Sequence, residues 1–369
     1  MRTLHIATFN KAERNLGVMH QMQWEQEAAR HLGIEWTSEV WTTDAAPDFS
    51  VHRLIPARQT SFPMRRVHFH SQIRKSASNY DQIVVRYAPL DFFAPLLPIK
   101  LKQKCSIVFH TKTGEYLRKA GLLGGPIAAL DKALGGHLMR GANCLIGVTP
   151  EIVSYEKTRL GFNSPAIVYP NGIYLADWST SPTDLRSDKY KVAFVASHFF
   201  PWNGLEKLLE SARDETPNYP WELHLVGSHT PQQKYFCELN GLQETVFFHG
   251  TLPTTAVNAL IAKMDLSLAA FDLGQLGSTE ACTLKVRESL GAGVPVYSGH
   301  PDCAFPSDFP FYRVGAPRIC EIVDHARTMR TVARNEVRSA SRPYIDKVAL
   351  LRNLWSSLSY SGDRALSYG

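Results

Sequence analysis

The sequence predicts an α/β protein of two lobes, each built on a parallel sheet. Short β-branched runs alternate with longer amphipathic stretches, and a spacing of roughly 20 to 40 residues between the runs is typical of parallel strands joined by helices. The alternation stops in a polar segment at 175–191 and then restarts. The length of 369 residues also fits about two domains.

The first lobe is expected to contain a helix at 19–32 and strands at 4–9, 82–87, 106–110, 144–148 and 166–169. In the second lobe we expect strands at 192–196, 222–226, 246–249, 266–270 and 294–297, helices at 205–212, 255–264 and 283–290, and a terminal helix at 342–358. These elements predict an N-terminal Rossmann-like domain at 1–178 and a C-terminal one at 188–340. A C-terminal helical segment at 341–369 is expected to cross back onto the first domain.

Composition excludes several classes of protein. A hydrophobic content of 44% with 20% charged residues rules out a mainly disordered chain, and no apolar run reaches the ~18 residues of a membrane span. The N-terminus does not resemble a signal peptide. The net charge of +6 permits an anionic ligand but does not require nucleic acid. Six cysteines without a CxxC pair indicate reduced thiols in the cytoplasm and no zinc site.

The most informative segment is 277–299, GSTEACTLKVRESLGAGVPVYSG. If Thr283 opens a helix, Glu288 lies one to two turns into it and Glu280 lies in the preceding loop. The helix start offers unpaired N–H groups and a positive potential, which suit a phosphate. The two carboxylates could then face a ribose and a sugar hydroxyl.

This segment resembles the Glu-x7-Glu motif, and the sequence that follows it, of retaining GT-B glycosyltransferases of the family-4-like group. Five further pieces resemble that family in the right order. They are 108–111 (VFHT), 170–173 (PNGI), 194–209 (FVASHFFPWNGLEKLL), 224–227 (HLVG) and 248–252 (FHGTL).

The resemblance implies a GT-B fold, with two Rossmann-like lobes facing across a cleft. It also implies a retaining, metal-independent hexosyltransferase without a cofactor, which moves a sugar from a nucleotide-diphospho-sugar to an acceptor hydroxyl. A glycan or a lipid-linked or surface-polysaccharide intermediate would be the acceptor. By resemblance, the nucleobase is expected to pack near Gly250, Thr251 and Leu252, and the ribose to bond Glu288. The diphosphate is expected to contact Thr283, Leu284 and Lys285, with Asn203 at the border of the donor site. The transferred sugar is expected to face His110 and Glu280.

The sequence departs from the family at its cationic clamp. Asn203 precedes Gly204 where the family usually has lysine, and Ser197 and His198 stand near the usual arginine. We expect Lys285 to replace these cations, in preference to Lys207 or Arg287. The incomplete clamp leaves two alternatives open, a catalytically idle glycan- or partner-binding subunit and a nucleotide-sugar epimerase or hydrolase.

Three stretches combine cations with apolar residues: 65–75, 92–102 and 116–125. Apolar residues beside cations suit an anionic membrane surface, although a basic helix face is also commonly solvated. We therefore expect a cytoplasmic protein that can lie peripherally on the inner face of a membrane.

Overall fold

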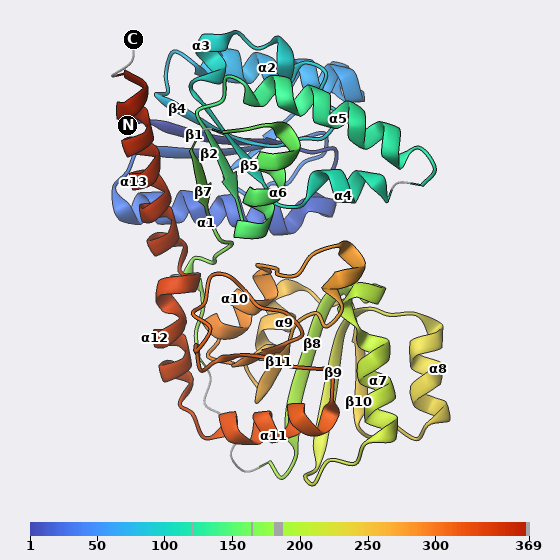
Figure 1. The fold of residues 1–369 in the computed structure, drawn as a ribbon. Helices are drawn as coiled ribbons and strands as arrows, with labels where there is room; N and C mark the ends of the chain where they lie inside the picture. Colours follow the sequence, from blue (N-terminus) through green and yellow to red (C-terminus); the bar gives the residue numbers. More distant parts are fainter. Residues whose placement is uncertain (120, 164, 181–186, 367–369) are drawn as a thin grey trace. The chain divides into compact units, whose positions relative to one another are not determined.

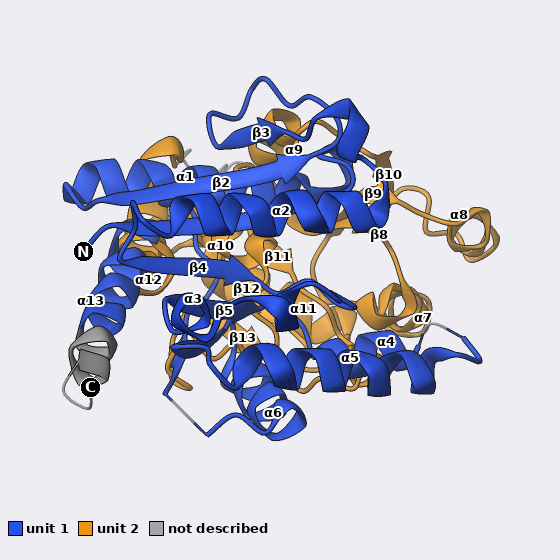
Figure 2. Cartoon of the chain, turned by 90° about the horizontal axis from the view of Figure 1, so that it is seen from above, with its two compact units in different colours: residues 1–174, 347–369 blue, residues 175–346 orange. Residues whose placement is uncertain are grey.

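Two separate parallel sheets organise the chain, which confirms the predicted α/β class with two Rossmann-like units (Figure 1). The computed structural model describes residues 1–119, 121–163, 165–180 and 187–366. Unit 1 comprises residues 1–174 and 347–369, and unit 2 comprises residues 175–346 (Figure 2). The corresponding expectations were 1–178 with 341–369, and 188–340; part of the expected polar segment, 181–186, lies outside the described residues.

Unit 1 is a seven-stranded sheet in the order β3-β2-β1-β4-β5-β6-β7. All neighbouring strands pair in parallel. The strands are β1 (Thr3–Thr8), β2 (Trp36–Thr42), β3 (His52–Leu54), β4 (Gln82–Arg86), β5 (Cys105–Phe109), β6 (Cys144–Gly147) and β7 (Ala166–Val168). The helices are α1 (Leu16–Leu32), α2 (Phe62–Ser76), α3 (Ile99–Lys102), α4 (Thr113–Arg118), α5 (Gly124–Met139), α6 (Pro150–Leu160) and α13 (Lys347–Leu366).

Side-chain alternation along these strands fills a separate core on each face of the sheet. Ile83 and Ile107 pack with residues of α2, α5 and α6. Val84 and Val108 point to the other face, where they pack with residues of α1 and α13. The near-continuous apolar runs of β4 and β5 are therefore explained by burial on both faces.

Unit 2 is a six-stranded parallel sheet in the order β10-β9-β8-β11-β12-β13. Its strands are β8 (Tyr190–His198), β9 (Trp221–Ser228), β10 (Val246–Gly250), β11 (Leu266–Leu268), β12 (Val296–Ser298) and β13 (Tyr312–Val314). The helices are α7 (Leu205–Asp214), α8 (Pro231–Leu239), α9 (Thr254–Ile261), α10 (Leu284–Gly291), α11 (Ile319–Arg330) and α12 (Arg334–Ile345). One core joins residues of α7, α8 and α11 to β8, β9 and β11.

The expectation of one terminal helix at 342–358 was wrong. Two helices, α12 and α13, meet at Asp346, whose extended backbone (φ −74°, ψ 118°) ends α12. The Asp346 carboxylate lies 3.3 Å from Nε of Arg342, and the next amide, of Lys347, donates to the Ile173 carbonyl at 2.7 Å. Helical periodicity alone does not reveal such a break, because both helices are amphipathic.

The basic stretch at 65–75 lies on α2, and its polar residues are not uniformly solvated. Arg66, His68 and His70 are buried; His70 pairs with Asp91, and His68 packs against Trp41 of β2. Two apolar residues of α2, Phe62 and Val67, are exposed instead. Within the described residues, no helix combines the length and apolar character needed to cross a membrane.

Gly227 on β9 provides a test of the packing between central strands. Its φ of +135° is unfavourable for any residue with a side chain, and an added Cβ would lie 1.8 Å from the Ala196 carbonyl oxygen on β8. We expect Gly227→Ala to lower the free energy of unfolding of unit 2 by about 3 kcal/mol or more. Gly241→Ala is the matched control. Gly241 has a φ of +69°, but a Cβ added there would have no neighbour within 4 Å, so we expect its free energy of unfolding to fall by only about 1 kcal/mol. Denaturant unfolding measures both, and equal losses would contradict the steric explanation.

Candidate functional site

In unit 2 the strand order reverses between β8 and β11. Ligands of open parallel sheets bind at the carboxyl ends of the strands beside such a reversal. Here the Asn203 carbonyl accepts from the Phe271 amide at 3.0 Å, which ties the loop after β8 to the loop after β11. The Asn203 side chain accepts from the Phe200 amide at 2.9 Å and so holds its own loop closed. Asn203 is therefore placed at this edge, with its side-chain oxygen already bonded.

Helix α10 begins at this same edge, and Thr283 is its N-cap residue as the sequence predicts. Thr283 makes no capping hydrogen bond with its side chain, and its Oγ1 atom is buried without a hydrogen-bond partner. The first N–H groups of a helix lack intrahelical acceptors. The α10 N-terminus thus presents amide donors and a buried hydroxyl that an oxygen-rich anion can satisfy.

Lys285 and Glu288 follow on the first two turns of α10. Burial lowers the pKa of Lys285 to about 8, partly opposed by the charge of Glu288. Burial raises the pKa of Glu288 to about 7, partly opposed by the charge of Lys285. Both side chains are half-buried, and neither charge fully compensates the lost hydration of the other, so the pair is a candidate for a ligand-binding site.

The other two candidate cations of unit 2 are already paired. Arg287 is fully buried and makes a double hydrogen bond to the Asp302 carboxylate. Lys207 lies 2.8 Å from the Asp272 carboxylate. These pairs leave Lys285 as the cation near the start of α10 that has no hydrogen bond or ion pair among the described side chains, in line with the sequence-based preference for it.

The remaining predicted residues of unit 2 lie at separate places. Glu280 lies half-buried in the loop before α10, where its charge acts on the Cys303 thiol. Gly250 ends β10 with a φ of +66°, followed by exposed Thr251 and half-buried Leu252. Their roles toward a ligand stay predictions.

His300 is a site residue that sequence reasoning missed. It lies beyond the carboxyl end of β12, is buried, and has an Nε2 atom without a partner. Burial lowers its pKa, and the nearby charge of Lys285 lowers it further, so a neutral imidazole lies close to the α10 site. A histidine that directly follows a buried strand run is the sequence signal that could have identified it.

In unit 1, His110 directly follows β5 and lines a small pocket. Its Nε2 atom is buried and has no hydrogen-bond partner. Burial places its pKa well below the ordinary value, and the charges of Arg86, His5 and Lys347 lower it further. His110 is therefore a neutral imidazole surrounded by cationic groups.

The same pocket contains a buried charge network, which the sequence did not reveal. Glu25 lies 2.6 Å from Nδ1 of His5, accepts from the Tyr169 hydroxyl at 3.1 Å, and lies 3.8 Å from the Lys347 ammonium. Burial opposes ionisation of Glu25, but His5 and Lys347 outweigh it and lower the pKa of this carboxyl. Arg86 also lines the pocket.

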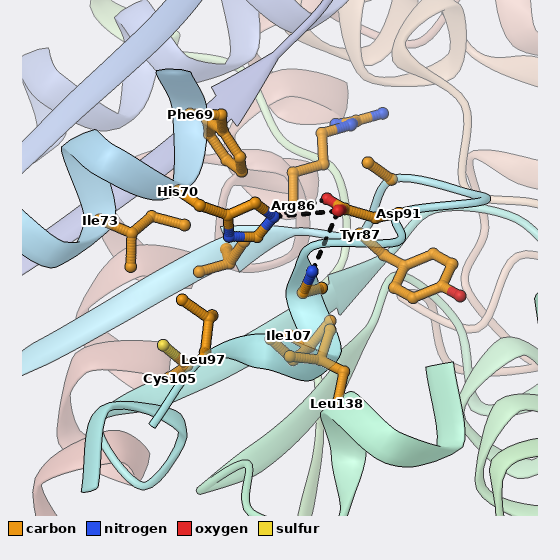
Figure 3. A pocket seen from close by; sticks show the side chains of 13 residues that line it. Phe69, His70, Ile73, Arg86, Tyr87, Asp91, Leu97, Cys105, Ile107 and Leu138 are labelled. Atoms are coloured by element: carbon orange, nitrogen blue, oxygen red, sulfur yellow. Dashed lines mark hydrogen bonds and ion pairs between the residues drawn. The ribbon is translucent and has the colours of Figure 1, made fainter. Parts of the chain in front are cut away.

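A second pocket of unit 1 is mainly apolar and lies beside β4 (Figure 3). Nε2 of His70 lies 2.9 Å from the Asp91 carboxylate, and Asp91 also accepts from the amides of Phe93 and Ala94. The carboxylate thus fixes the loop that covers the pocket. In Figure 3, the guanidinium of Arg86 points away from this pair and from the apolar lining.

The raised pKa of Glu288 predicts a pH-dependent stability difference. A carboxyl whose pKa is higher in the folded state stabilises the fold while protonated, and this contribution is lost as pH rises from below 4.5 to above about 7. Glu288→Gln should therefore unfold like the wild type near pH 5 and be more stable by about 1–2 kcal/mol at pH 8. Urea unfolding of the wild type and of Glu288→Gln between pH 5 and pH 8 tests this prediction. Glu244→Gln, at an exposed glutamate, is the control and should show no such pH dependence. A difference in unfolding free energy between wild type and Glu288→Gln that does not change with pH would contradict the buried environment assigned to Glu288.

Residues 179–306 match the family model of glycosyl transferases group 1. No curated protein matches the chain. Among solved structures, a glycosyltransferase from Rickettsia africae is 11% identical, with a TM-score of 0.67 and coverage of 98% of both chains. HepE of Anabaena, in complex with UDP and glucose, is 15% identical with a TM-score of 0.64 and covers 98% of this chain and 100% of its own. The apo form of the lipopolysaccharide outer core galactosyltransferase WaaB is 13% identical with a TM-score of 0.60. The match covers 98% of this chain and 99% of the WaaB chain.

These identities are low, so the structural likeness shows the fold, which is that of GT-B glycosyltransferases. The family match falls on unit 2, which carries the α10 site. The two findings together support a glycosyltransferase.

Proposed function

We propose that this protein is a retaining glycosyltransferase that takes a sugar from a nucleotide-diphospho-sugar bound to unit 2. The observation that carries the proposal is the uncapped N-terminus of α10, with the unpartnered Thr283 hydroxyl and Lys285 beside it, inside the segment that matches glycosyl transferases group 1. HepE of Anabaena, which shares the fold, was solved with UDP and glucose.

The diphosphate would be held by the first-turn amides of α10, the Thr283 hydroxyl and the Lys285 ammonium. Charge on a departing diphosphate is stabilised most strongly by donors that are fixed and shielded from water. An anion beside Lys285 would also restore the pKa that burial lowers. No metal is needed in this arrangement, since the protein itself supplies the compensating charge.

Glu288 would accept hydrogen bonds from the ribose hydroxyls, and Glu280 from the transferred sugar. His110 of unit 1 is neutral, so it can donate one N–H to a sugar hydroxyl and help to orient it. Retention would follow from attack on the same face that the diphosphate leaves, with a phosphate oxygen accepting the proton of the acceptor hydroxyl. No protein nucleophile takes part in this scheme.

The acceptor is proposed to be presented to unit 1, with a lipid-linked intermediate as the favoured class. Three separate segments of this unit expose large apolar side chains: Phe62, Met64 and Val67 on α2, Phe92, Leu96 and Ile99 after β4, and Tyr116, Leu122 and Leu123 between β5 and α5. Exposed Lys100 adjoins the second segment, whereas the Lys102 ammonium is engaged by the Pro95 carbonyl at 2.8 Å. Such a mixture suits an anionic lipid surface on the cytoplasmic side.

Lys285→Ala and Glu288→Ala should each weaken binding of the preferred nucleoside diphosphate at least tenfold, corresponding to about 1.4 kcal/mol or more. Lys285→Ala removes an ionic contact to the diphosphate, and Glu288→Ala removes the hydrogen bonds to the ribose. Isothermal titration with UDP, GDP and ADP measures both affinities. Lys263→Ala, an exposed lysine of the same unit, is the matched control and should bind like the wild type.

Unchanged affinities in both variants would refute the site assignment. Product analysis with nucleotide-sugars then separates the alternatives. An epimerase returns a nucleotide-sugar of altered configuration without an acceptor, whereas an idle subunit neither transfers nor hydrolyses any nucleotide-sugar.

The membrane proposal is tested by co-sedimentation with vesicles. The wild type should bind vesicles that contain anionic phospholipid and not neutral vesicles. A Phe92→Ser, Leu96→Ser double variant should bind several-fold less, because these side chains, 50% and 67% exposed, would enter the interface. Leu239→Ser on unit 2, where the side chain is 70% exposed, should behave like the wild type. Equal losses for both variants, or no binding by the wild type, would exclude this surface.

A further inference from the structure

Three aromatic side chains, those of His198, Phe200 and Trp202, gather where the chain leaves β8 at the carboxyl edge of the unit 2 sheet. The rings of Phe200 and Trp202 stack with centroids 4.3 Å apart and planes at 17°, and the His198 ring lies 4.5 Å from that of Phe200. Phe200 is 40% exposed, whereas His198 and Trp202 are half-buried. Phe199 of the same loop belongs to the core of unit 2 and anchors the loop, so the three neighbouring rings lie at the surface as an aromatic platform.

The loop that carries the aromatic platform is held in one conformation by its own contacts. The Phe200 amide donates to the Asn203 side chain at 2.9 Å, and the Asn203 amide donates to the Phe200 carbonyl at 2.8 Å. Gly204 ends the loop with a φ of +73°, and a Cβ added to it would lie 2.8 Å from Cβ of Phe271. The rings are therefore presented by a pre-organised backbone, which lowers the entropy that is lost when a ligand binds.

Polar side chains of a second loop, which follows β11, border the platform. The Asp272 amide donates to the Trp202 carbonyl at 3.1 Å, which brings these two residues together. The Asp272 carboxylate accepts from Nε2 of Gln275 at 2.6 Å and lies 2.8 Å from the Lys207 ammonium. Trp202 itself adds an indole N–H donor. The two loops thus combine aromatic faces with planar hydrogen-bonding groups at one place on the edge of the sheet.

This combination suits the ring of a sugar. One face of a hexose carries C–H groups, whose partial positive charge is attracted by the negative face of an aromatic ring, and burial of that face removes apolar surface from water. The hydroxyls at the edge of the sugar need polar partners, which the carboxylate of Asp272 and the amide of Gln275 can supply. An anionic membrane is a poorer fit, because the Asp272 carboxylate neutralises the Lys207 ammonium beside the platform.

We propose that the aromatic platform, bordered by Asp272 and Gln275, binds a sugar ring, with Trp202 as its principal contact because indole is the largest of the three rings. The platform lies beside the strand-order reversal, where ligands of open parallel sheets bind, and inside the segment 179–306 that matches glycosyl transferases group 1. The inference rests on the proposed function for the origin of the ring, which is the sugar of the donor or a sugar of the acceptor. Because this loop replaces the cationic clamp of the family, the resemblance does not supply the contact.

Titration calorimetry of the full chain tests the proposal in two arms. The first compares UDP and GDP with UDP-glucose, UDP-galactose, UDP-N-acetylglucosamine and GDP-mannose. The second uses the methyl glycosides of the same four sugars, with and without saturating nucleoside diphosphate, so that it does not depend on the donor site. Trp202→Ala should weaken binding of at least one sugar-bearing probe about fivefold or more, because it removes both the ring contact and the indole donor. A loss confined to nucleotide-sugars assigns the platform to the donor sugar, and a loss for glycosides assigns it to the acceptor.

Trp202→Tyr keeps an aromatic face and a polar group, so it should retain most of the affinity, which guards against a folding defect in Trp202→Ala. Tyr235→Ala is the matched control, since Tyr235 lies on α8 and is 63% exposed, and it should bind like the wild type.

Unchanged affinity of Trp202→Ala for every sugar-bearing probe, or an equal loss in Tyr235→Ala, would overturn the proposal. Loss of vesicle binding by Trp202→Ala with unchanged affinity for sugars would assign the platform to a membrane and would also overturn it. Lys285→Ala tests the donor site separately. If Lys285→Ala binds nucleoside diphosphate like the wild type while Trp202→Ala loses sugar binding, the assignment of the diphosphate to α10 fails and the platform stands.

Discussion

An ionised side chain that leaves water must gain an opposite charge or a bound ligand, because desolvation costs several kcal/mol otherwise. Over most of this molecule, buried cations satisfy the constraint with carboxylates. The pairs include Arg159 with Asp131 and Glu156, Arg287 with Asp302, and Arg330 with Asp265. Buried Arg334 and Lys102 instead bond backbone carbonyls, and Lys285, Arg86 and Arg66 have neither kind of partner among the described residues. At the carboxyl end of the unit 2 sheet, a bound anion would compensate the charge of Lys285.

The two sheets impose this arrangement through their topology. Every strand is parallel to its neighbours, so all strand-to-helix loops of a sheet emerge at one edge. Core packing occupies most of the strand interiors on both faces, so the polar side chains that a ligand can reach are expected mainly where the strands end. Arg86, His110, His198 and His300 each end or follow a buried strand, which is the pattern expected when an edge, rather than a face, serves for binding.

The sequence predicted those elements whose apolar pattern is continuous. The runs QIVVR and CSIVF are buried on both faces, and they form β4 and β5 within one residue of the expected bounds. In contrast, β2 reads WTSEVWT, in which buried and half-buried residues alternate, and it was not predicted because its polar residues mask the strand. The α2 segment was interpreted as a basic helix face, solvated or lying on an anionic membrane, and its bounds were not predicted, since its buried Arg66, His68 and His70 do not form a hydrophobic stripe.

The candidate sites show the same dependence on local sequence. Thr283, Lys285 and Glu288 lie on consecutive turns of one helix, so their spacing along the chain already determines their spacing in space. The pocket of unit 1 draws instead on residues from His5 to Lys347, which only the fold brings together. Strand register would have placed Arg86 and His110 on one face, because both continue a run of alternate buried residues.

What register cannot supply is the identity of the helix that covers that face. The break at Asp346 lets the chain return to unit 1, where the Lys347 amide bonds the Ile173 carbonyl and its ammonium approaches Glu25. Glu25 is then held by Lys347, His5 and Tyr169, and its charge only partly offsets the effect of burial on Arg86. The terminal helix thus does more than cover the sheet: its first residue joins the buried charge network of Glu25, His5 and Tyr169, which ties the end of the chain to the carboxyl ends of the first strands.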